Sequence, residues 1–175
     1  RNIDLPVSVF HGYRVLWGPR TIKDMIVQGE LGDMFAFESR YWQSSIAQMA
    51  LEGTQDKRSW KNDPHLNGPW DVLTDLGSHV ADLCLYLMAE IPIESRCWVS
   101  YCNSPAEHRD THVHLSVKFP GGKSAMASIS KIVHGAANDF EFTVFGSRGT
   151  ATWRFLRPDE VDFGAGSRRV LLRRE

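Results

Sequence analysis

Residues 111–129 have the sequence THVHLSVKFPGGKSAMASI, in which two alternating runs flank a glycine turn. The side chains at every second position of these runs are apolar or β-branched: Thr111, Val113, Leu115, Val117, Phe119, Ala125, Ala127 and Ile129. A period of two is typical of a strand with one buried face. The Gly121-Gly122 pair favours a tight hairpin. The segment therefore predicts two antiparallel strands, the first of which carries His112 and His114 on its second face.

The same alternation continues on both sides of this hairpin. We expect further strands at residues 34–43, 95–102, 139–145 and 151–155, and a short buried strand at residues 6–11. Two segments have helical periodicity instead: residues 19–28 and, more strongly, residues 70–88. Residues 44–69 are polar with little periodicity and predict a long loop, which is usually functional. Helices followed by a meander of strands predict an α+β fold, with an open, largely antiparallel β-sheet and helices packed on one face.

Composition excludes several classes of function. The 175 residues fit one domain, and 20 Lys and Arg balance 21 Asp and Glu, so no basic field favours nucleic acid or an anionic membrane as a partner. No apolar run approaches the roughly 20 residues of a membrane span. Three cysteines without a Cys-x-x-Cys pair indicate a cytoplasmic protein. One basic cluster at residues 168–174 predicts a solvated edge or a limited phosphate contact.

The longer predicted helix carries a polar strip apart from its apolar stripe. Asp75, His79, Asp82 and Tyr86 are spaced four, three and four residues apart and share one face. A carboxylate one turn before an imidazole can orient the ring, raise its pKa and let the pair exchange a proton with a substrate hydroxyl. The alternative is an exposed pair on a solvated helix face. Gly77 costs roughly 1 kcal/mol inside a helix, which indicates a close approach to the backbone there.

Other polar groups suggest rival chemistries. His65, His79 and Asp82 could hold a divalent metal, as in a metal-dependent sugar isomerase or hydrolase. His112 and His114 lie on one side of a strand, but no third ligand is evident and a solvated face explains them. A third reading is a non-catalytic interaction module that binds a protein through the open sheet face. No Gly-x-Gly-x-x-Gly fingerprint occurs, so no dinucleotide site of the usual kind is encoded.

Residues 75–83, DLGSHVADL, resemble the glucose–fructose oxidoreductase / inositol dehydrogenase (Gfo/Idh/MocA) family. Further segments agree with that family in order and spacing, and together they cover nearly the whole chain. They are Tyr13-Arg14, a following helix that ends in GELG at 29–32, WKNDP at 60–64 and FGSRGTA at 145–151. One departure is Asn67-Gly68-Pro69-Trp70, where relatives commonly carry a glycine run before the helix.

The resemblance implies the function of an NAD(P)-dependent oxidoreductase that acts on a sugar or cyclitol hydroxyl. Asp75 and His79 would be catalytic and flank that hydroxyl. The sugar pocket would be lined by Trp60, Lys61, His65 and Asp82, because an aromatic ring can stack on a sugar's apolar face.

The resemblance also implies a domain organisation, with a fold like the C-terminal domain of dihydrodipicolinate reductase. Residues 15–175 would form the substrate-binding and catalytic C-terminal domain, and residues 1–14 would be the remnant of a linker. An N-terminal Rossmann domain, absent from this chain, would bind NAD or NADP and supply the family's catalytic lysine. We therefore expect this chain alone to be inactive.

The second face of the predicted sheet is not uniformly polar. Large or apolar residues share it with polar ones: Trp98, Cys102 and Phe145 with Ser100, His112, His114, Ser116 and Thr143. A sheet face in water should be mostly polar, so this face predicts a partner surface. We expect a homodimer or homotetramer through it, as the family resemblance also implies. The alternative is that a further helix or the nucleotide domain covers it.

Overall fold

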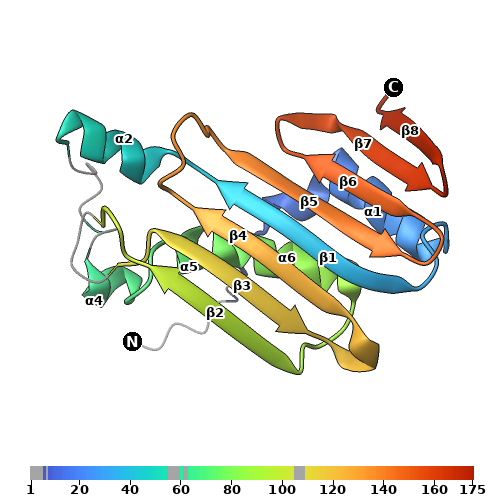
Figure 1. Ribbon diagram of the computed structural model, residues 1–175, viewed down its shortest axis with the longest axis horizontal. Helices are drawn as coiled ribbons and strands as arrows, with labels where there is room; N and C mark the ends of the chain where they lie inside the picture. The colour runs from blue at the N-terminus through green and yellow to red at the C-terminus, as the bar shows by residue number, and fades with distance from the viewer. Residues whose placement is uncertain (1–5, 7, 55–59, 61–62, 105–108) are drawn as a thin grey trace.

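The computed structural model describes residues 6, 8–54, 60, 63–104 and 109–175 (Figure 1). The first half of the chain is mainly helical, with η1 (Gly12–Val15), α1 (Trp17–Val27), β1 (Met34–Trp42), α2 (Ser45–Glu52), α4 (Pro64–Asn67), α5 (Val72–Asp75) and α6 (Gly77–Met88). The second half contains the other strands, β2 (Glu94–Ser100), β3 (His112–Lys118), β4 (Ser124–Ser130), β5 (Asp139–Gly146), β6 (Thr150–Arg154), β7 (Arg157–Ala165) and β8 (Arg168–Arg173), with the turn η2 (Pro120–Gly122) between β3 and β4.

All eight strands form one open sheet in the order β2-β3-β4-β1-β5-β6-β7-β8. Strand β1 runs parallel to β4, and the other described neighbours are antiparallel. Figure 1 shows α1, α5 and α6 behind the sheet, whose other face is turned to the viewer. The predicted α+β fold with helices on one face is confirmed.

The predicted hairpin of residues 111–129 forms from β3 and β4. Val113 pairs with Ile129, Leu115 with Ala127 and Val117 with Ala125. Both glycines of its turn have positive φ, 70° at Gly121 and 81° at Gly122, a conformation that other residues adopt only with strain.

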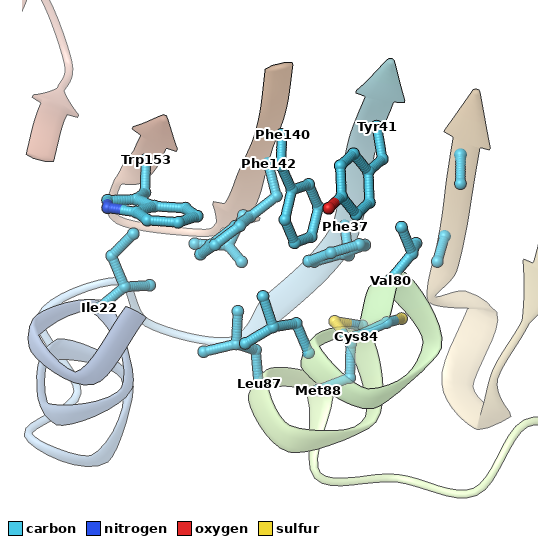
Figure 2. Packing of buried hydrophobic residues seen from close by; sticks show 14 of the residues in the cluster. Ile22, Phe37, Tyr41, Val80, Cys84, Leu87, Met88, Phe140, Phe142 and Trp153 are labelled. Carbon is cyan, nitrogen blue, oxygen red and sulfur yellow. The ribbon is translucent and has the colours of Figure 1, made fainter. Parts of the chain in front are cut away.

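An aromatic layer on the buried face of the sheet packs against the helices (Figure 2). Phe37 stacks on Phe142 with ring centroids 5.6 Å apart, and Tyr41 stacks on Phe140 at 4.7 Å. Trp153 of β6 is fully buried, and its indole nitrogen donates to a main-chain carbonyl. Burial of each large apolar side chain contributes about 1.5–3 kcal/mol, so this layer fixes the position of α6 under the sheet.

The structure corrects three predicted elements. The helix expected over residues 70–88 is interrupted at Leu76, between α5 and α6. Residues 44–69, expected as loop, contain the helices α2 and α4, and α2 ends at Gly53 with φ of 64°. Residues 6–11 are not a buried strand, because Val9 and Phe10 are largely exposed and the described residues there form no strand.

The C-terminal strands β7 and β8 were not predicted, although the basic cluster of residues 168–174 belongs to them. Its arginines pair with acidic neighbours: Arg169 with Asp162 at 3.1 Å and Arg173 with Glu160 at 3.3 Å. The cluster therefore forms the exposed edge of the sheet, and ion pairs occupy these two of its arginines.

The three cysteines are free, with Cys84 buried and the other two exposed. Burial raises the pKa of the Cys84 thiol to about 12. Across the described residues, no helix has the length and apolar character that crossing a membrane requires.

Candidate active site

His79 lies in the first turn of α6 and is half-buried among aromatic rings. Its ring centroid is 5.1 Å from that of Tyr13, 5.8 Å from that of His11 and 6.4 Å from that of Tyr41. Burial and the neighbouring His11 lower the pKa of His79, although Asp75 and Asp82 act in the opposite direction. The prediction of a raised pKa is therefore wrong. The pattern along one helix shows Asp75 and Asp82, but it shows neither the burial of the ring nor the approach of His11. A neutral imidazole can accept a proton from a hydroxyl group.

The Nδ1 atom of His79 is buried and has no hydrogen-bond partner among the described residues. Buried polar atoms are normally satisfied, so an orphaned ring nitrogen requires an explanation.

Residues 11–14 cover the polar strip of α6 beyond His79. Arg14 donates from Nε to Asp82 Oδ2 at 2.7 Å and from Nη2 to Asp82 Oδ1. The same guanidinium lies over the ring of Tyr86, 5.0 Å from its centroid. The predicted strip is thus divided: Asp82 and Tyr86 contact Arg14, while His79 lies in the first turn of α6 and Asp75 at the end of α5.

A hydrogen-bonded cluster fixes Tyr13 beside His79. The hydroxyls of Tyr13 and Tyr41 are 2.8 Å apart, and Tyr41 donates to Asn138 Oδ1 at 2.8 Å. Asn138 donates from Nδ2 to the Tyr13 hydroxyl and accepts from Gln43. Burial, more than these contacts, raises the pKa of Tyr41, which keeps the phenol protonated. The wall of rings around His79 is therefore held by side chains of β1 and the segment before β5.

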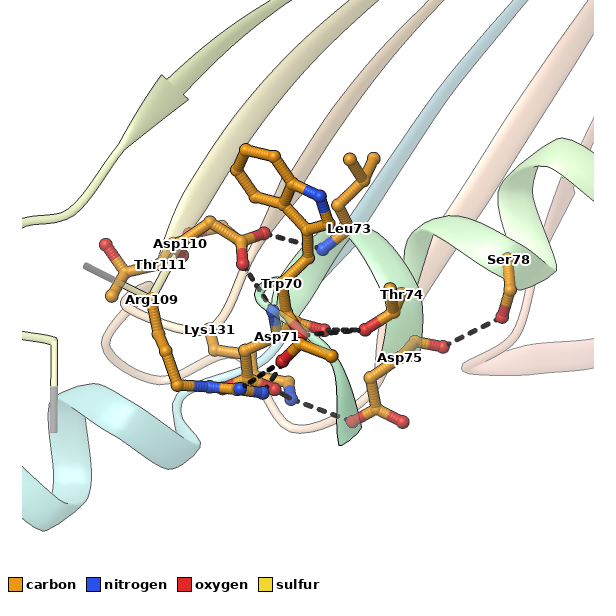
Figure 3. Close-up of polar contacts among 12 residues, drawn as sticks. Trp70, Asp71, Leu73, Thr74, Asp75, Ser78, Arg109, Asp110, Thr111 and Lys131 are labelled. Carbon is orange, nitrogen blue, oxygen red and sulfur yellow. Dashed lines mark hydrogen bonds and ion pairs between the residues drawn. The ribbon is translucent and has the colours of Figure 1, made fainter. Parts of the chain in front are cut away.

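Asp75 forms an ion pair that the sequence did not predict. Lys131 donates from Nζ to Asp75 Oδ2 at 2.7 Å and to Asp71 Oδ1 at 2.6 Å (Figure 3). The side chains of Lys131 and Asp71 are 7% and 8% exposed, whereas that of Asp75 is 35% exposed. Asp75 therefore connects a buried ion pair to the open side of the site. The sequence offered only a weak signal for this pair, because Lys131 is a single lysine that directly follows Ser130 at the end of the alternating run.

The connection into α5 is fixed by residues that were also missed. Asp110, fully buried, accepts hydrogen bonds from the main-chain N–H of Asp71 and, at 2.7 Å, of Leu73. Arg109 donates to the carbonyls of Gly68 and Trp70 at 2.8 and 2.9 Å. The bonds to Asp110 satisfy two N–H groups at the start of α5 from a distant segment, and those from Arg109 fix the residues before it.

Gly77 lies where α6 packs closely against α5 and the sheet. A Cβ there would lie 3.3 Å from Leu73 Cδ1 and 3.5 Å from Ile129 Cδ1. The predicted close approach to the backbone is real, but protein side chains make it.

Apart from Asp82 on α6, the predicted pocket residues belong to the segment that precedes α5 in the sequence. Trp60 is 50% exposed, and His65 is exposed on α4, where its main-chain N–H donates to Asp63 Oδ1 at 2.8 Å. Lys61 lies outside the described residues. Figure 1 places α4 beyond the start of α5, at the same end of the sheet as α2. Of the residues predicted as catalytic or ligand-binding, the structure brings Asp75 and His79 together on consecutive helical turns.

The described ranges also bear on the metal-binding alternative. They contain no group of three or more His, Cys, Asp or Glu arranged to hold a metal ion. His112 and His114 form a pair on the outer face of β3, with their Nε2 atoms 2.9 Å apart. The Asp82 carboxylate, proposed with His65 and His79 as a metal ligand, is engaged by Arg14.

Comparison with known proteins identifies the fold. A family model described as the GFO/IDH/MocA C-terminal domain matches residues 20–152. The uncharacterized oxidoreductase YfiI of Bacillus subtilis (strain 168) is 24% identical over 144 residues, which are 81% of this chain and 36% of that protein. The chain thus spans about a third of the length of this curated relative.

Two solved structures have the same fold. An inositol dehydrogenase homolog from Azotobacter vinelandii in complex with NAD+ superposes with a TM-score of 0.87 at 23% identity, covering 96% of this chain and 43% of that one. Levoglucosan dehydrogenase in complex with NADH gives a TM-score of 0.79 at 22% identity, covering 94% and 45%. At this identity the likeness establishes the fold.

Proposed function

The chain belongs to the GFO/IDH/MocA family as its C-terminal domain, and on that premise we propose that it is the substrate-binding and catalytic domain of an NAD(P)-dependent oxidoreductase acting on a sugar or cyclitol hydroxyl. The substrate class is supported by the names of two similar proteins, an inositol dehydrogenase homolog and levoglucosan dehydrogenase. Residues 15–175 would form this domain. A nucleotide domain on the N-terminal side, joined through residues 1–14, would bind NAD or NADP.

The environment of His79 carries the proposal. Its pKa is lowered, one ring nitrogen is buried without a partner among the described residues, and Asp75 lies one helical turn away. In the oxidation, the hydroxyl proton passes to His79 while Asp75 orients the hydroxyl, and the substrate carbon becomes a carbonyl. A nicotinamide cofactor held by the nucleotide domain would supply the acceptor for the hydride from the same carbon.

The residues on the rim would determine which sugar binds. We assign Trp60 to stacking on an apolar sugar face, a role for which a half-exposed indole is suited, and Lys61 and His65 to sugar hydroxyls. For Asp82 the pairing with Arg14 supports a different role from the one expected. It would hold residues 11–14 on α6 and thereby place Tyr13 against His79.

The outer face of the sheet would pack against a second copy of the chain. Trp98 is 60% exposed and Met126 57% exposed on that face. Antiparallel partners lie on the same face, so the pairing of Trp98 with His114, and of His114 with Ser128, places these groups side by side. A dimer through this face is the simplest closed assembly that would cover them.

The experiment is turnover by the full-length protein. The gene that encodes this domain is expressed together with any upstream nucleotide domain, and NAD+ and NADP+ reduction is followed with a panel of cyclitols and sugars that includes myo-inositol and levoglucosan. We expect reduction with at least one compound. The 175-residue chain alone should not bind either nucleotide in calorimetry. Micromolar binding to it would contradict the proposal that a separate nucleotide domain binds the cofactor.

A further inference from the structure

Lys131 is a buried cation at the candidate site. It follows β4 directly, its main-chain N–H donates to Thr111 O at 3.1 Å, and its carbonyl accepts from the N–H groups of Ile46 and Ala47. Its side chain is 7% exposed. The backbone at Lys131 is thus fixed by the start of β3 on one side and the first turn of α2 on the other, and its side chain extends from a rigid base.

The ammonium of Lys131 lies between two carboxylates with unequal surroundings. Asp71 is buried with it, and a buried ion pair of this kind compensates the cost of taking each charge out of water. Asp75 is the partly exposed partner, in the turn before His79. The pairing with Asp71 is therefore enough to compensate the buried charge of Lys131, so the contact with Asp75 is additional.

The second contact fixes the side chain of Asp75. Oδ2 accepts from Lys131 at 2.7 Å, which restricts the orientation of the carboxylate. Asp75 lies at the end of α5, next to the break at Leu76, and its side chain is 35% exposed. Productive orientation of a reacting group is worth large factors in rate, and a misplacement of about 1 Å can cost roughly 100-fold.

We propose that Lys131 is a positioning residue that acts on the reaction through Asp75; this rests on the function proposed above. Lys131 does not touch the substrate. It holds the Asp75 side chain in one orientation beside His79, while Asp71 balances the charge of the buried ammonium. The alternative role is purely structural, in which Lys131 only joins β4 to the segment before α5. The two roles differ in whether the effect of Lys131 on kcat depends on Asp75.

A double-mutant cycle on kcat separates them in the full-length enzyme. Lys131→Gln should lower kcat by roughly 10- to 100-fold with KM changed less than about threefold, because orientation and not binding is lost. In an Asp75→Asn background the same change should have almost no further effect. If Lys131→Gln costs the same factor in both backgrounds, the positioning role is overturned.

Further variants serve as controls for the change in net charge and for loss of folding. Removing one partner of a buried pair can unfold a protein, so the Lys131→Gln, Asp71→Asn double variant removes one positive and one negative charge and keeps the net charge. It should have the low kcat of Lys131→Gln, whereas Asp71→Asn alone should keep kcat within about threefold. Lys131→Arg should recover most of kcat, because it preserves a charged donor to Asp75. Wild-type kcat in the double variant would overturn the proposal.

Failure of the proposed function is distinguishable from failure of this inference. Absence of turnover with every compound and both nucleotides would overturn the oxidoreductase function. The contact is then tested without substrate, through the ammonium resonance of isotope-labelled Lys131 in the full-length protein. It should be protected from exchange and should shift on Asp75→Asn; a resonance that does not move would overturn the role assigned to Lys131.

Discussion

Arg14 donates two hydrogen bonds to the carboxylate of Asp82, a residue 68 positions away in the sequence. The pair fastens residues 11–14 to the side of α6 that also carries His79. Tyr13, the neighbour of Arg14, is thereby held edge-on to the His79 ring. The environment of the candidate catalytic histidine therefore depends on a segment that precedes the first long helix of the domain.

Arg14→Gln should lower the free energy of unfolding by about 1 kcal/mol, measured by urea denaturation. The bidentate geometry favours a real contribution, but the 44% exposed arginine is screened by solvent, which limits it. Arg157→Gln is the control, because Arg157 is 68% exposed and lies 3.8 Å from Glu160. This control should change stability by less than about 0.5 kcal/mol, and equal effects of the two variants would contradict the role of Arg14.

Alanine substitution at two glycines, each at or near the start of a helix, should change stability by different amounts. A Cβ at Gly18 of α1 would overlap the indole of Trp153, which is fully buried and cannot move aside. Gly18→Ala should therefore destabilise by about 1–3 kcal/mol, despite the better helix propensity of alanine. At Gly77 the nearest atoms are the ends of flexible side chains at 3.3 Å and beyond, so Gly77→Ala should be near neutral. Thermal unfolding of both variants checks this contrast.

Local patterns in the sequence predicted the parts of the fold that depend on local periodicity. The hairpin of β3 and β4 follows from alternating side chains and the Gly121-Gly122 turn, and the Asp75–His79 spacing follows from the helical repeat. Contacts between distant segments were not accessible in this way. Asp110 accepts from the N–H groups of Asp71 and Leu73, which are 39 and 37 residues away in the sequence. The partner of Asp75 is Lys131, 56 residues away.

The direction of the His79 pKa was mispredicted for the same reason. Spacing along one helix showed only Asp75 and Asp82, which raise it. The larger contributions come from burial and from His11, which belongs to a segment without helical periodicity. An electrostatic prediction from one element alone therefore gave the wrong sign.

His79→Gln should reduce the loss of stability in mild acid. Burial holds the pKa of folded His79 below its ordinary value of 6.5, so in the range between these two pKa values the unfolded chain binds more protons. Stability then rises with pH across that range and falls as the solution is acidified. Unfolding free energies from about pH 5 to about pH 8 measure this slope.

The pH dependence of stability with and without His79 is best compared in a His112→Gln background, because burial and His114 lower the pKa of His112 as well. An NMR titration of the histidine rings gives the pKa of His79 directly. A pKa at or above 6.5 would contradict the neutral imidazole on which the proton transfer rests.

In the full-length enzyme, His79→Ala should lower kcat by roughly 10²- to 10⁴-fold, the usual contribution of a positioned acid–base group. Asp75→Asn should cost less, because it impairs orientation and leaves the proton carrier in place. Circular dichroism confirms that each variant is folded. Unchanged kcat in a folded His79→Ala variant would assign the Asp75–His79 pair to a solvated helix face.

Trp98→Ser should shift the protein from dimer to monomer in sedimentation equilibrium. Trp98 is 60% exposed on the outer face of β2, where its strand partner is His114 and where Met126 is also exposed. A stable interface buries about 800 Å² on each partner, and aromatic residues near its centre contribute most of the binding energy. Removing the indole should therefore weaken association by at least tenfold.

Leu156→Ser is the matched control for this prediction, because Leu156 is 61% exposed but lies in the turn between β6 and β7. A general loss of exposed apolar surface would affect both variants, whereas an interface centred on Trp98 predicts that Leu156→Ser stays dimeric. Fluorescence quenching gives an independent measure, since Trp98 should be shielded from solute quenchers in the wild-type protein at high concentration. A wild-type protein that is monomeric at high micromolar concentration, with Trp98 open to quenchers, would leave this face to another partner and remove the dimer from the proposed function.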